Sequence, residues 1–405
     1  MRIFLCLTLT LTLLGCVAGA QGLDGRQIHL RAGEHPSQWA PVALPYDGPQ
    51  PADNQRVIVV ESKTGKEFPA TVREGEFVFV PEGATPNQEL DYVVQLKEDA
   101  VPPAVQVVKK ENADALDIIV GGKPFTTYTY SNDNRKPFLW PVLSEGGVGV
   151  TRDWPMGEKV VTEDHVHQKS FWTAYGDING VDCWAETGEK SGYQHSDSVA
   201  SGSGGAYGWI VAKNTWQDKD HNPVIAENRE YRFYNTPESM KMVDVKVQFT
   251  AAYGDAKFGD TKEGGIVSLR MRDAMIEKNG TGVITNAEGL KGMEACWGKP
   301  SAWCDYSGTL EGAGLRGIAV FDNPANLRYP SRWHVRDYGL MGANCFGLNH
   351  FTKGEENGDY LLKNGEALVF AYRVYIHSGD AAQAKVGDRY ADYVTPPKAE
   401  WAGAK

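Results

Sequence analysis

The sequence of 405 residues lacks two features that would point to particular partners. Its net charge is −11, and acidic and basic side chains are interspersed, so there is no basic stripe to neutralise a phosphate backbone. Beyond residue 20, no apolar run is long enough to cross a bilayer. We therefore exclude nucleic acid as a partner and expect no membrane-spanning helix in the folded chain.

Cysteine is also scarce, with six residues in the whole chain. The four that follow the first twenty residues match no zinc-binding spacing: Cys183, Cys296, Cys304 and Cys345. An oxidising compartment would permit disulfides, and Cys296 with Cys304 is the pair closest in sequence. The alternative is that these residues are buried thiols.

The first twenty residues have the composition of an export signal. Arg2 forms a short basic region, and residues 3–14 form an apolar region too short to span a bilayer. Residues 13–16 resemble a lipobox that would leave a lipid on Cys16, whereas residues 18–20 fit ordinary cleavage before Gln21. Both alternatives predict an exported protein, in the periplasm, on the outer-membrane surface or outside the cell. A lipid anchor at Cys16 would be its one link to a membrane.

Long helical periodicity is nearly absent, and short alternating apolar runs take its place. Such runs, separated by glycine-rich turns, predict antiparallel strands in sandwiches or barrels; clear examples are residues 56–60, 76–80, 91–96, 242–249 and 367–375. The best helical candidate is 381–393, where apolar residues recur at helical spacing. The sequence therefore predicts an all-β fold.

A charged and proline-broken stretch near residues 97–115 predicts a domain boundary. We expect a small β-sandwich at 22–105, a linker at 106–114 and a larger β domain at 115–395. Every motif that contains several candidate catalytic or binding residues lies in the larger domain.

The strongest motif in this domain is the stretch 163–172. His165 and His167 stand at i and i+2, so on an extended strand both would face one ligand, and Asp164 precedes them. This pattern suits a metal half-site with a carboxylate orienter, or a general acid/base site. The alternative is a half-buried strand whose histidines bond to the backbone. Nearby polar and aromatic side chains suit a sugar, because polar groups bind hydroxyls and rings stack on C–H faces: Arg152, Trp172, Asp177, Asn179 and Trp184.

Three further motifs supply candidate residues. Glu263 beside two glycines is a candidate catalytic carboxylate, or the tip of a solvated hairpin. Asp305, flanked by large rings, is another candidate, whose pKa burial would raise in the absence of a partner. In the segment 333–347, His334 could complete a three-histidine metal site, and Arg336 and Asn344 could orient substrate oxygens, or Arg336 could form an ordinary ion pair.

Taken together, these blocks resemble a family of secreted bacterial proteins labelled methane oxygenase PmoA. The matching blocks lie at 152–172, 176–186, 258–265, 303–308 and 333–344, and the resemblance covers nearly all of 115–380. It implies a galactose-mutarotase-like supersandwich for the larger domain. Relatives occur beside sugar oxidoreductases and isomerases in polysaccharide-degrading bacteria. The family often has a third histidine where this chain has Gln168 or Lys169.

These observations predict an exported carbohydrate-active enzyme that cleaves or remodels a glycosidic linkage on the concave face of the large domain. His165, His167 and His334 would act as acid/base groups or would hold one divalent metal ion. The chemistry would be hydrolysis, which needs two carboxylates, or elimination beside a keto group, which needs a base and an electrophile. The alternatives are a non-catalytic glycan-binding lipoprotein and a metal-dependent oxidase.

Overall fold

The computed structural model describes residues 22–99, 101–157 and 163–403. The protein is all-β, with 48% of its residues in strands and 6% in helices, which confirms the predicted fold class. The export-type segment at 1–20, with Cys16, lies outside the described residues. No helix within the described residues is long and apolar enough to cross a membrane.

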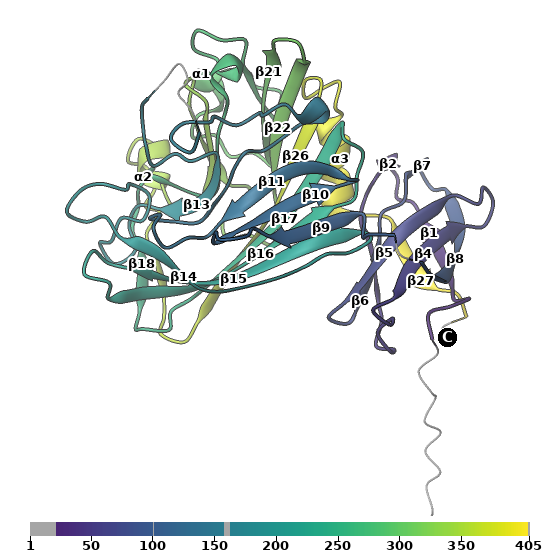
Figure 1. The fold of residues 1–405 in the computed structure, drawn as a ribbon. Helices are drawn as coiled ribbons and strands as arrows, with labels where there is room; N and C mark the ends of the chain where they lie inside the picture. The colour runs from purple at the N-terminus through teal and green to yellow at the C-terminus, as the bar shows by residue number, and fades with distance from the viewer. Residues whose placement is uncertain (1–21, 100, 158–162, 404–405) are drawn as a thin grey trace, which may run out of the picture.

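The N-terminal domain is one seven-stranded antiparallel sheet that curls into a near-barrel (Figure 1). Its strands, in spatial order, are β27 (Lys398–Trp401), β1 (Gln27–Arg31), β8 (Glu89–Glu98), β4 (Gln55–Glu61), β5 (Glu67–Arg73), β6 (Glu76–Phe79) and β3 (Val42–Pro45). A separate pair, β2 (Ser37–Gln38) and β7 (Gly83–Ala84), lies beside it. The edge strand β27 comes from the C-terminus, so both ends of the described chain meet in this domain.

The larger domain is a sandwich of two eight-stranded antiparallel sheets. The first sheet has the order β23 (Arg332–Val335), β24 (Leu340–Asn344), β19 (Gly264–Arg270), β13 (Phe171–Tyr175), β12 (Phe138–Leu139), β11 (Lys123–Thr129), β10 (Ala115–Val120) and β9 (Val105–Lys109). The second sheet has the order β14 (Tyr193–Gly202), β15 (Tyr207–Gln217), β16 (Pro223–Tyr234), β17 (Met240–Thr250), β26 (Ala367–Ser378), β22 (Gly314–Asp322), β21 (Trp303–Leu310) and β20 (Val283–Asn286).

Short elements connect these sheets. They are the strand pair β18 (Ala256–Phe258) and β25 (Tyr360–Leu362), the 3-10 turns η1 (Glu145–Gly147) and η2 (Asp273–Met275), and the helices α1 (Met293–Cys296), α2 (Leu348–Phe351) and α3 (Val386–Val394).

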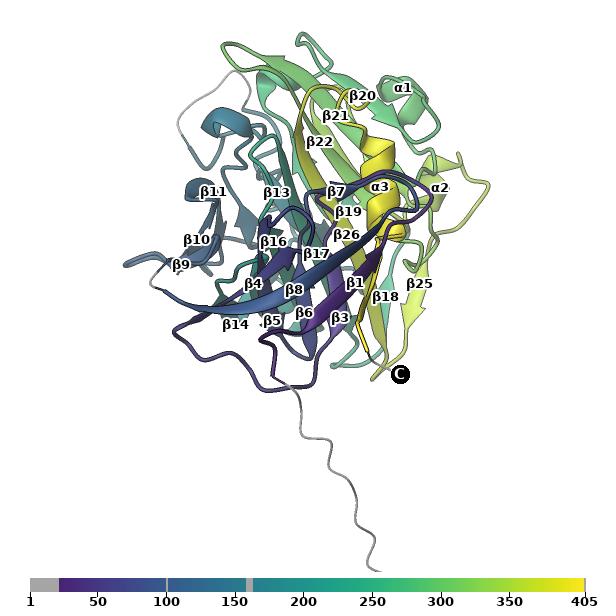
Figure 2. The same cartoon turned by 90° about the vertical axis from the view of Figure 1, so that its right-hand side faces the viewer.

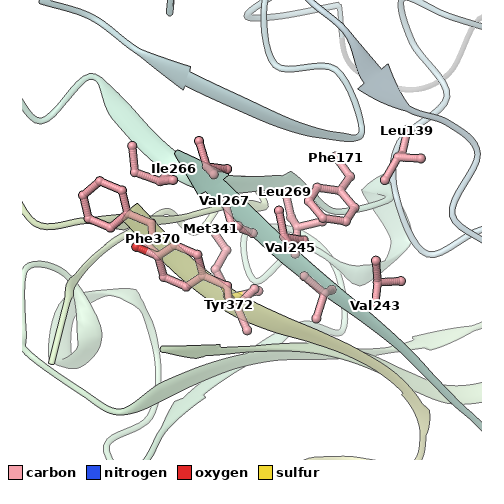
Figure 3. Close-up of a cluster of buried hydrophobic side chains, with 14 of the residues drawn as sticks. Leu139, Phe171, Val243, Val245, Ile266, Val267, Leu269, Met341, Phe370 and Tyr372 are labelled. Atoms are coloured by element: carbon pink, nitrogen blue, oxygen red, sulfur yellow. The ribbon is translucent and has the colours of Figure 1, made fainter. Parts of the chain in front are cut away.

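The main core lies between the two sheets of the sandwich (Figure 3). Alternation along each strand builds it: Val243, Val245 and Val247 on β17 point inward against Phe171 and Leu269 of the first sheet. Each large side chain buried here stabilises the fold by about 1.5–3 kcal/mol. Because every second residue of a strand points away from this core, each sheet also has an outer face.

The N-terminal domain and α3 cover part of the outer face of the second sheet (Figure 2). Val78 and Val80 of the N-terminal domain share a cluster with Tyr375 of β26 and with Val386 of α3. The outer face of the first sheet carries a separate aromatic cluster, whose buried members are Phe138, Trp172, Ala174, Trp184 and Leu340.

Three local expectations differ from the structure. The expected linker at 106–114 begins with strand β9, because Val105 and Val107 alternate against the core. The helix expected at 381–393 begins only at Val386, after Lys385 adopts a left-handed backbone that ends the preceding turn. Cys296 and Cys304 form no disulfide, and the four cysteines of the larger domain are buried free thiols.

Candidate active site

The three predicted histidines lie on the outer face of the first sheet. On β23, Trp333 and Val335 point into the core, so His334 between them points outward. His165 and His167 lie in the turn segment just before β13 rather than on a strand. Strand periodicity therefore does not explain their proximity.

His165 forms a pair with Asp164. Its Nδ1 lies 2.7 Å from Oδ2 of Asp164, and its ring stacks on that of Tyr338 with the centroids 5.0 Å apart. The side chain is 40% exposed, and Nε2 makes no hydrogen bond within the described residues. The backbone of His165 is left-handed, with φ of 49°, a conformation that clusters at functional sites. A partly exposed histidine that is oriented by a carboxylate is equipped to transfer a proton.

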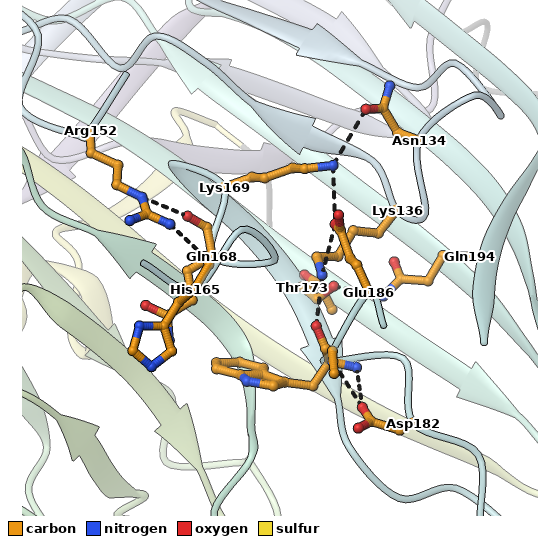
Figure 4. Close-up of polar contacts among 12 residues, drawn as sticks. Asn134, Lys136, Arg152, His165, Gln168, Lys169, Thr173, Asp182, Glu186 and Gln194 are labelled. Carbon is orange, nitrogen blue, oxygen red and sulfur yellow. Dashed lines mark hydrogen bonds and ion pairs between the residues drawn. The ribbon is translucent and has the colours of Figure 1, made fainter. Parts of the chain in front are cut away.

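Two buried arginines hold Asp164 in place. Arg152 Nη1 and Arg270 Nη2 lie 2.9 Å and 2.8 Å from its Oδ1, and Arg152 also donates to the backbone oxygens of His165 and Gln168 (Figure 4). Burial alone would raise the pKa of Asp164, but Arg270, His165 and Arg152 outweigh it and the pKa is lowered. Asp164 is therefore a fixed anion that orients His165.

Gln168 and Lys169, where the resemblance expects a third histidine, belong to two separate networks. Oε1 of Gln168 accepts a hydrogen bond of 2.6 Å from Arg270. Lys169 lies 3.0 Å from Glu186, which is also 3.2 Å from the buried Lys136 (Figure 4). Both side chains thus bind charged groups of the site and hold them in place.

His167 lies beside the second of these networks. Its ring centroid is 5.7 Å from that of His165 and 6.0 Å from that of Trp184. Burial, helped by the positive charge of Lys136, lowers its pKa to about 3. Burial likewise lowers the pKa of Lys136 to about 8. His167 is therefore a neutral imidazole at neutral pH.

His334, like His167, packs beside Trp184. Its ring stacks on Trp184 with the centroids 6.3 Å apart, and neither ring nitrogen makes a hydrogen bond of normal geometry within the described residues. Burial first, and then the positive charges of Arg336 and Lys262, lower its pKa to about 3, although the nearby Lys262 backbone opposes the shift. His334 is a neutral imidazole inside the aromatic cluster.

The donor set does not fit a metal ion. The described residues contain no group of three His, Cys, Asp or Glu side chains placed to hold a metal. The three histidines share one face without converging on one point.

The predicted stacking and clamping residues also lie on this face. Trp172 and Trp184 pack against each other with centroids 5.5 Å apart and are buried, so they form its floor instead of exposed platforms. Arg336 is half-buried, and its guanidinium lies 5.6 Å from the ring centre of Trp297.

The two predicted carboxylates are in different places. Glu263, just before β19, is partly exposed and pairs with Lys262; it acts electrostatically on Tyr338, so it belongs to the rim of the site. Asp305 is on β21 of the other sheet, fully buried, with Oδ2 2.7 Å from Nε2 of His377. The structure therefore does not bring Asp305 to the candidate site with His165, His167 and His334.

The side chains of three predicted substrate-binding residues make hydrogen bonds to backbone groups. Asp177 accepts from the Gly180 N–H, and Asn179 bridges to Lys257 and Asp255. The Asn344 amide donates to Thr261 and Lys262 carbonyls, and its oxygen accepts from two more N–H groups. These contacts shape the loops under the site.

Sequence reasoning missed four residues that position the histidines: Lys136, Glu186, Arg270 and Tyr338. Arg270 and Tyr338 stand in quoted motif blocks or next to them, but no spacing rule links either to residue 165. Alternation on β19 could have placed Arg270 on an outer face, since Leu269 and Met271 are apolar.

Comparison with known proteins identifies a family without an assigned activity. Residues 115–391 match the model of DUF6807, described as a family of unknown function. A search of curated proteins finds no match for the chain.

Proposed function

Because the chain belongs to DUF6807, a family of unknown function, we propose its activity from the geometry of the site. We propose an exported carbohydrate-active enzyme that breaks a glycosidic linkage by elimination, with His165 as the base. The observation that carries this proposal is the Asp164–His165 pair, with the His165 side chain partly exposed and the Tyr338 ring stacked on it. The export-type segment at 1–20 supports the location.

The ion pairs made by the carboxylates of this face favour elimination over hydrolysis. Hydrolysis uses one carboxyl group as acid and another as base or nucleophile. On this face, Asp164 is bound by two arginines and Glu186 by two lysines, while Glu263 pairs with Lys262. Since each carboxylate already serves a cation, the histidine is the better candidate for proton transfer.

The step we propose begins at a carbon next to a carbonyl group. Nε2 of His165 takes the proton from this carbon, the C–H electrons form a carbon–carbon double bond, and the bond to the departing sugar oxygen breaks. The oxygen leaves with a proton from the Tyr338 hydroxyl. Burial raises the pKa of Tyr338, with a side-chain hydrogen bond to Gln168 and the charges of Arg336 and Arg270 opposing, so this hydroxyl is protonated at neutral pH.

The test is a screen of glycosides with and without an oxidised ring carbon, with wild-type protein and His165→Gln. We expect an unsaturated product from the wild type alone. Turnover of no substrate would replace the proposal with a glycan-binding protein. Loss of turnover in chelator, restored by a metal, would favour the metal-dependent oxidase that the resemblance to PmoA proteins suggests.

A further inference from the structure

Five neighbouring side chains, on the outer face of the first sheet and at the end of helix α1 beside it, have buried nitrogens without partners. We call Trp172, Trp184, His334, Trp297 and Arg336 the donor row. Nε1 of each tryptophan, both ring nitrogens of His334 and Nε of Arg336 lack a hydrogen bond of normal geometry within the described residues. Buried polar atoms are normally paired, and an unpaired group calls for an explanation, such as a missing ligand.

These side chains form a continuous path. Ring centroids are 5.5 Å apart between Trp172 and Trp184, and 6.3 Å between Trp184 and His334. Phe351 links the path onward, with centroids 6.4 Å from His334 and 5.3 Å from Trp297. Arg336 lies over Trp297 at the half-buried end, and its charge acts on His334 and on Tyr338, whose ring stacks on His165.

Burial alone does not leave tryptophans unpaired in this protein. Trp216 and Trp333 are as buried as Trp172, yet Trp216 donates to Glu227 at 2.6 Å and Trp333 donates to the Ser301 carbonyl at 2.9 Å. Two of the unpaired indoles, Trp172 and Trp184, thus belong to the aromatic cluster of the face that carries the candidate site.

Arg336 also differs from the other cations of this face. Arg152 and Arg270 share Asp164, Lys136 and Lys169 share Glu186, and Lys262 pairs with Glu263. The Arg336 side chain has no ion pair and no hydrogen bond in the ranges 22–99, 101–157 and 163–403. Its guanidinium fork matches a carboxylate.

Indole and guanidinium groups only donate hydrogen bonds, so their ligand must supply acceptors. We propose that the donor row binds an acidic sugar, a uronic acid, with its carboxylate on Arg336. This inference rests on the proposed function, because it names the electron-withdrawing group beside which His165 removes a proton.

The bound carboxylate would make the elimination feasible. The C5–H bond, next to the carboxylate at C6, breaks as His165 takes the proton, and a double bond forms between C4 and C5. The C4–O bond breaks, and the departing oxygen receives the Tyr338 proton. Arg336 neutralises the carboxylate and so stabilises charge that builds on it as C5 loses its proton. No oxidant or reductant is required.

The test compares matched acidic and neutral oligosaccharides by calorimetry and by the ultraviolet absorbance of the unsaturated product. Suitable probes are β-1,4-glucuronate oligomers against cello-oligosaccharides, and galacturonate oligomers against their methyl esters, together with sulfated oligosaccharides. The variants are Arg336→Gln, Arg336→Lys, Trp297→Phe and His165→Gln. Arg31→Gln is the charge-matched control, because Arg31 is an exposed residue of the N-terminal domain. Circular dichroism checks the fold of each.

We expect the wild type to prefer an acidic oligomer over its neutral partner. Arg336→Gln should weaken acidic binding by roughly tenfold or more, as loss of a charged hydrogen bond implies. Arg336→Lys should keep part of it, Trp297→Phe should lose less, and Arg31→Gln should lose nothing. His165→Gln should still bind but form no product.

Other results separate this inference from the proposed function. Equal affinity for acids, esters and neutral sugars, or unchanged acid binding in Arg336→Gln, overturns the uronate assignment. Preference for sulfated oligosaccharides does so as well. Cleavage of neutral keto-glycosides that depends on His165, without acid binding, overturns the assignment but keeps the elimination. Acid binding through Arg336 without any product keeps the assignment and removes the elimination.

Discussion

The protein holds two Asp–His pairs of the same length on the outer faces of its two large sheets. Asp164–His165 and Asp305–His377 each span 2.7 Å, and each histidine lies with its ring centre 5.0 Å from that of a tyrosine, Tyr338 or Tyr375. His165 is 40% exposed, whereas both members of the second pair are fully buried.

The difference shows that accessibility, more than pair geometry, separates a chemical site from a structural one. The N-terminal domain and α3 pack over the second sheet, and the Tyr375 hydroxyl beside His377 donates to the Ala384 carbonyl. Among residues 22–99, 101–157 and 163–403, no domain packs in this way over the partly exposed His165. The same chemical groups can therefore serve proton transfer on one face and stability on the other.

The largest expected effect is on activity at the first pair. His165→Gln should lower kcat by roughly 10²–10⁴-fold, the usual contribution of a general base. Its unfolding free energy should change by less than about 0.5 kcal/mol, since the ring is partly exposed. Steady-state kinetics and urea unfolding measure the two quantities. Full activity in this variant would remove the distinction between the pairs.

The second pair should respond in the opposite way. Asp305→Ala leaves His377 unpaired in a fully buried position, so the unfolding free energy should fall by about 3 kcal/mol or more. Activity per folded molecule should be unchanged, because Asp305 lies on the other sheet. His377→Gln is the companion variant. A selective loss of kcat in Asp305→Ala or His377→Gln would show that the reaction takes place on the second sheet and not at His165.

Acid should destabilise the protein through its buried neutral histidines. The pKa of His334 is about 3, below the ordinary 6.5, so between these pH values the unfolded chain binds a proton that the folded chain does not. Stability therefore falls as pH falls from about 6.5 toward 3. His334→Phe should reduce the slope of the unfolding free energy against pH in this range by up to about 1.4 kcal/mol per pH unit. Urea midpoints at a series of pH values measure it, and an unchanged slope would contradict a neutral His334.

The smallest effect concerns the tyrosine under His165. Tyr338→Phe keeps the stacked ring, and Tyr338→Leu removes it, so the difference between them isolates the stack. We expect about 0.5–1.5 kcal/mol, or roughly a 2- to 13-fold further loss in kcat/KM, from the looser imidazole. Tyr375→Leu is the matched change at His377 and should alter melting temperature alone. Equal kinetics for the two Tyr338 variants would show that Asp164 alone orients His165.

Much of the fold could be predicted because strands leave a local signature. The runs at 56–60, 91–96, 242–249 and 367–375 lie in strands of the structure, and the run at 76–80 does so up to Phe79, where β6 ends. The C-terminal strand β27 could not be predicted, because its partner β1 is more than 360 residues away and no local pattern encodes that pairing.

The candidate site divides in the same way. The motif around His165 and His167 could be found from residue types at short spacing. Asp305 stood out among large rings, but its partner His377, 72 residues away, gave no local signal, and only the register of β21, β22 and β26 brings the two together.

The sequence by itself determined the all-β class, the position of the dense motifs and the identity of His165 with its neighbouring carboxylate, because alternation and adjacency are local properties. Only the tertiary structure decided which groups are charged, buried or accessible. Arg152, Arg270 and Tyr338 reach the Asp164–His165 pair from separate segments, and His377 is fully buried on the other sheet. Solvation and electrostatic fields depend on every atom nearby in space, and chain order does not record that.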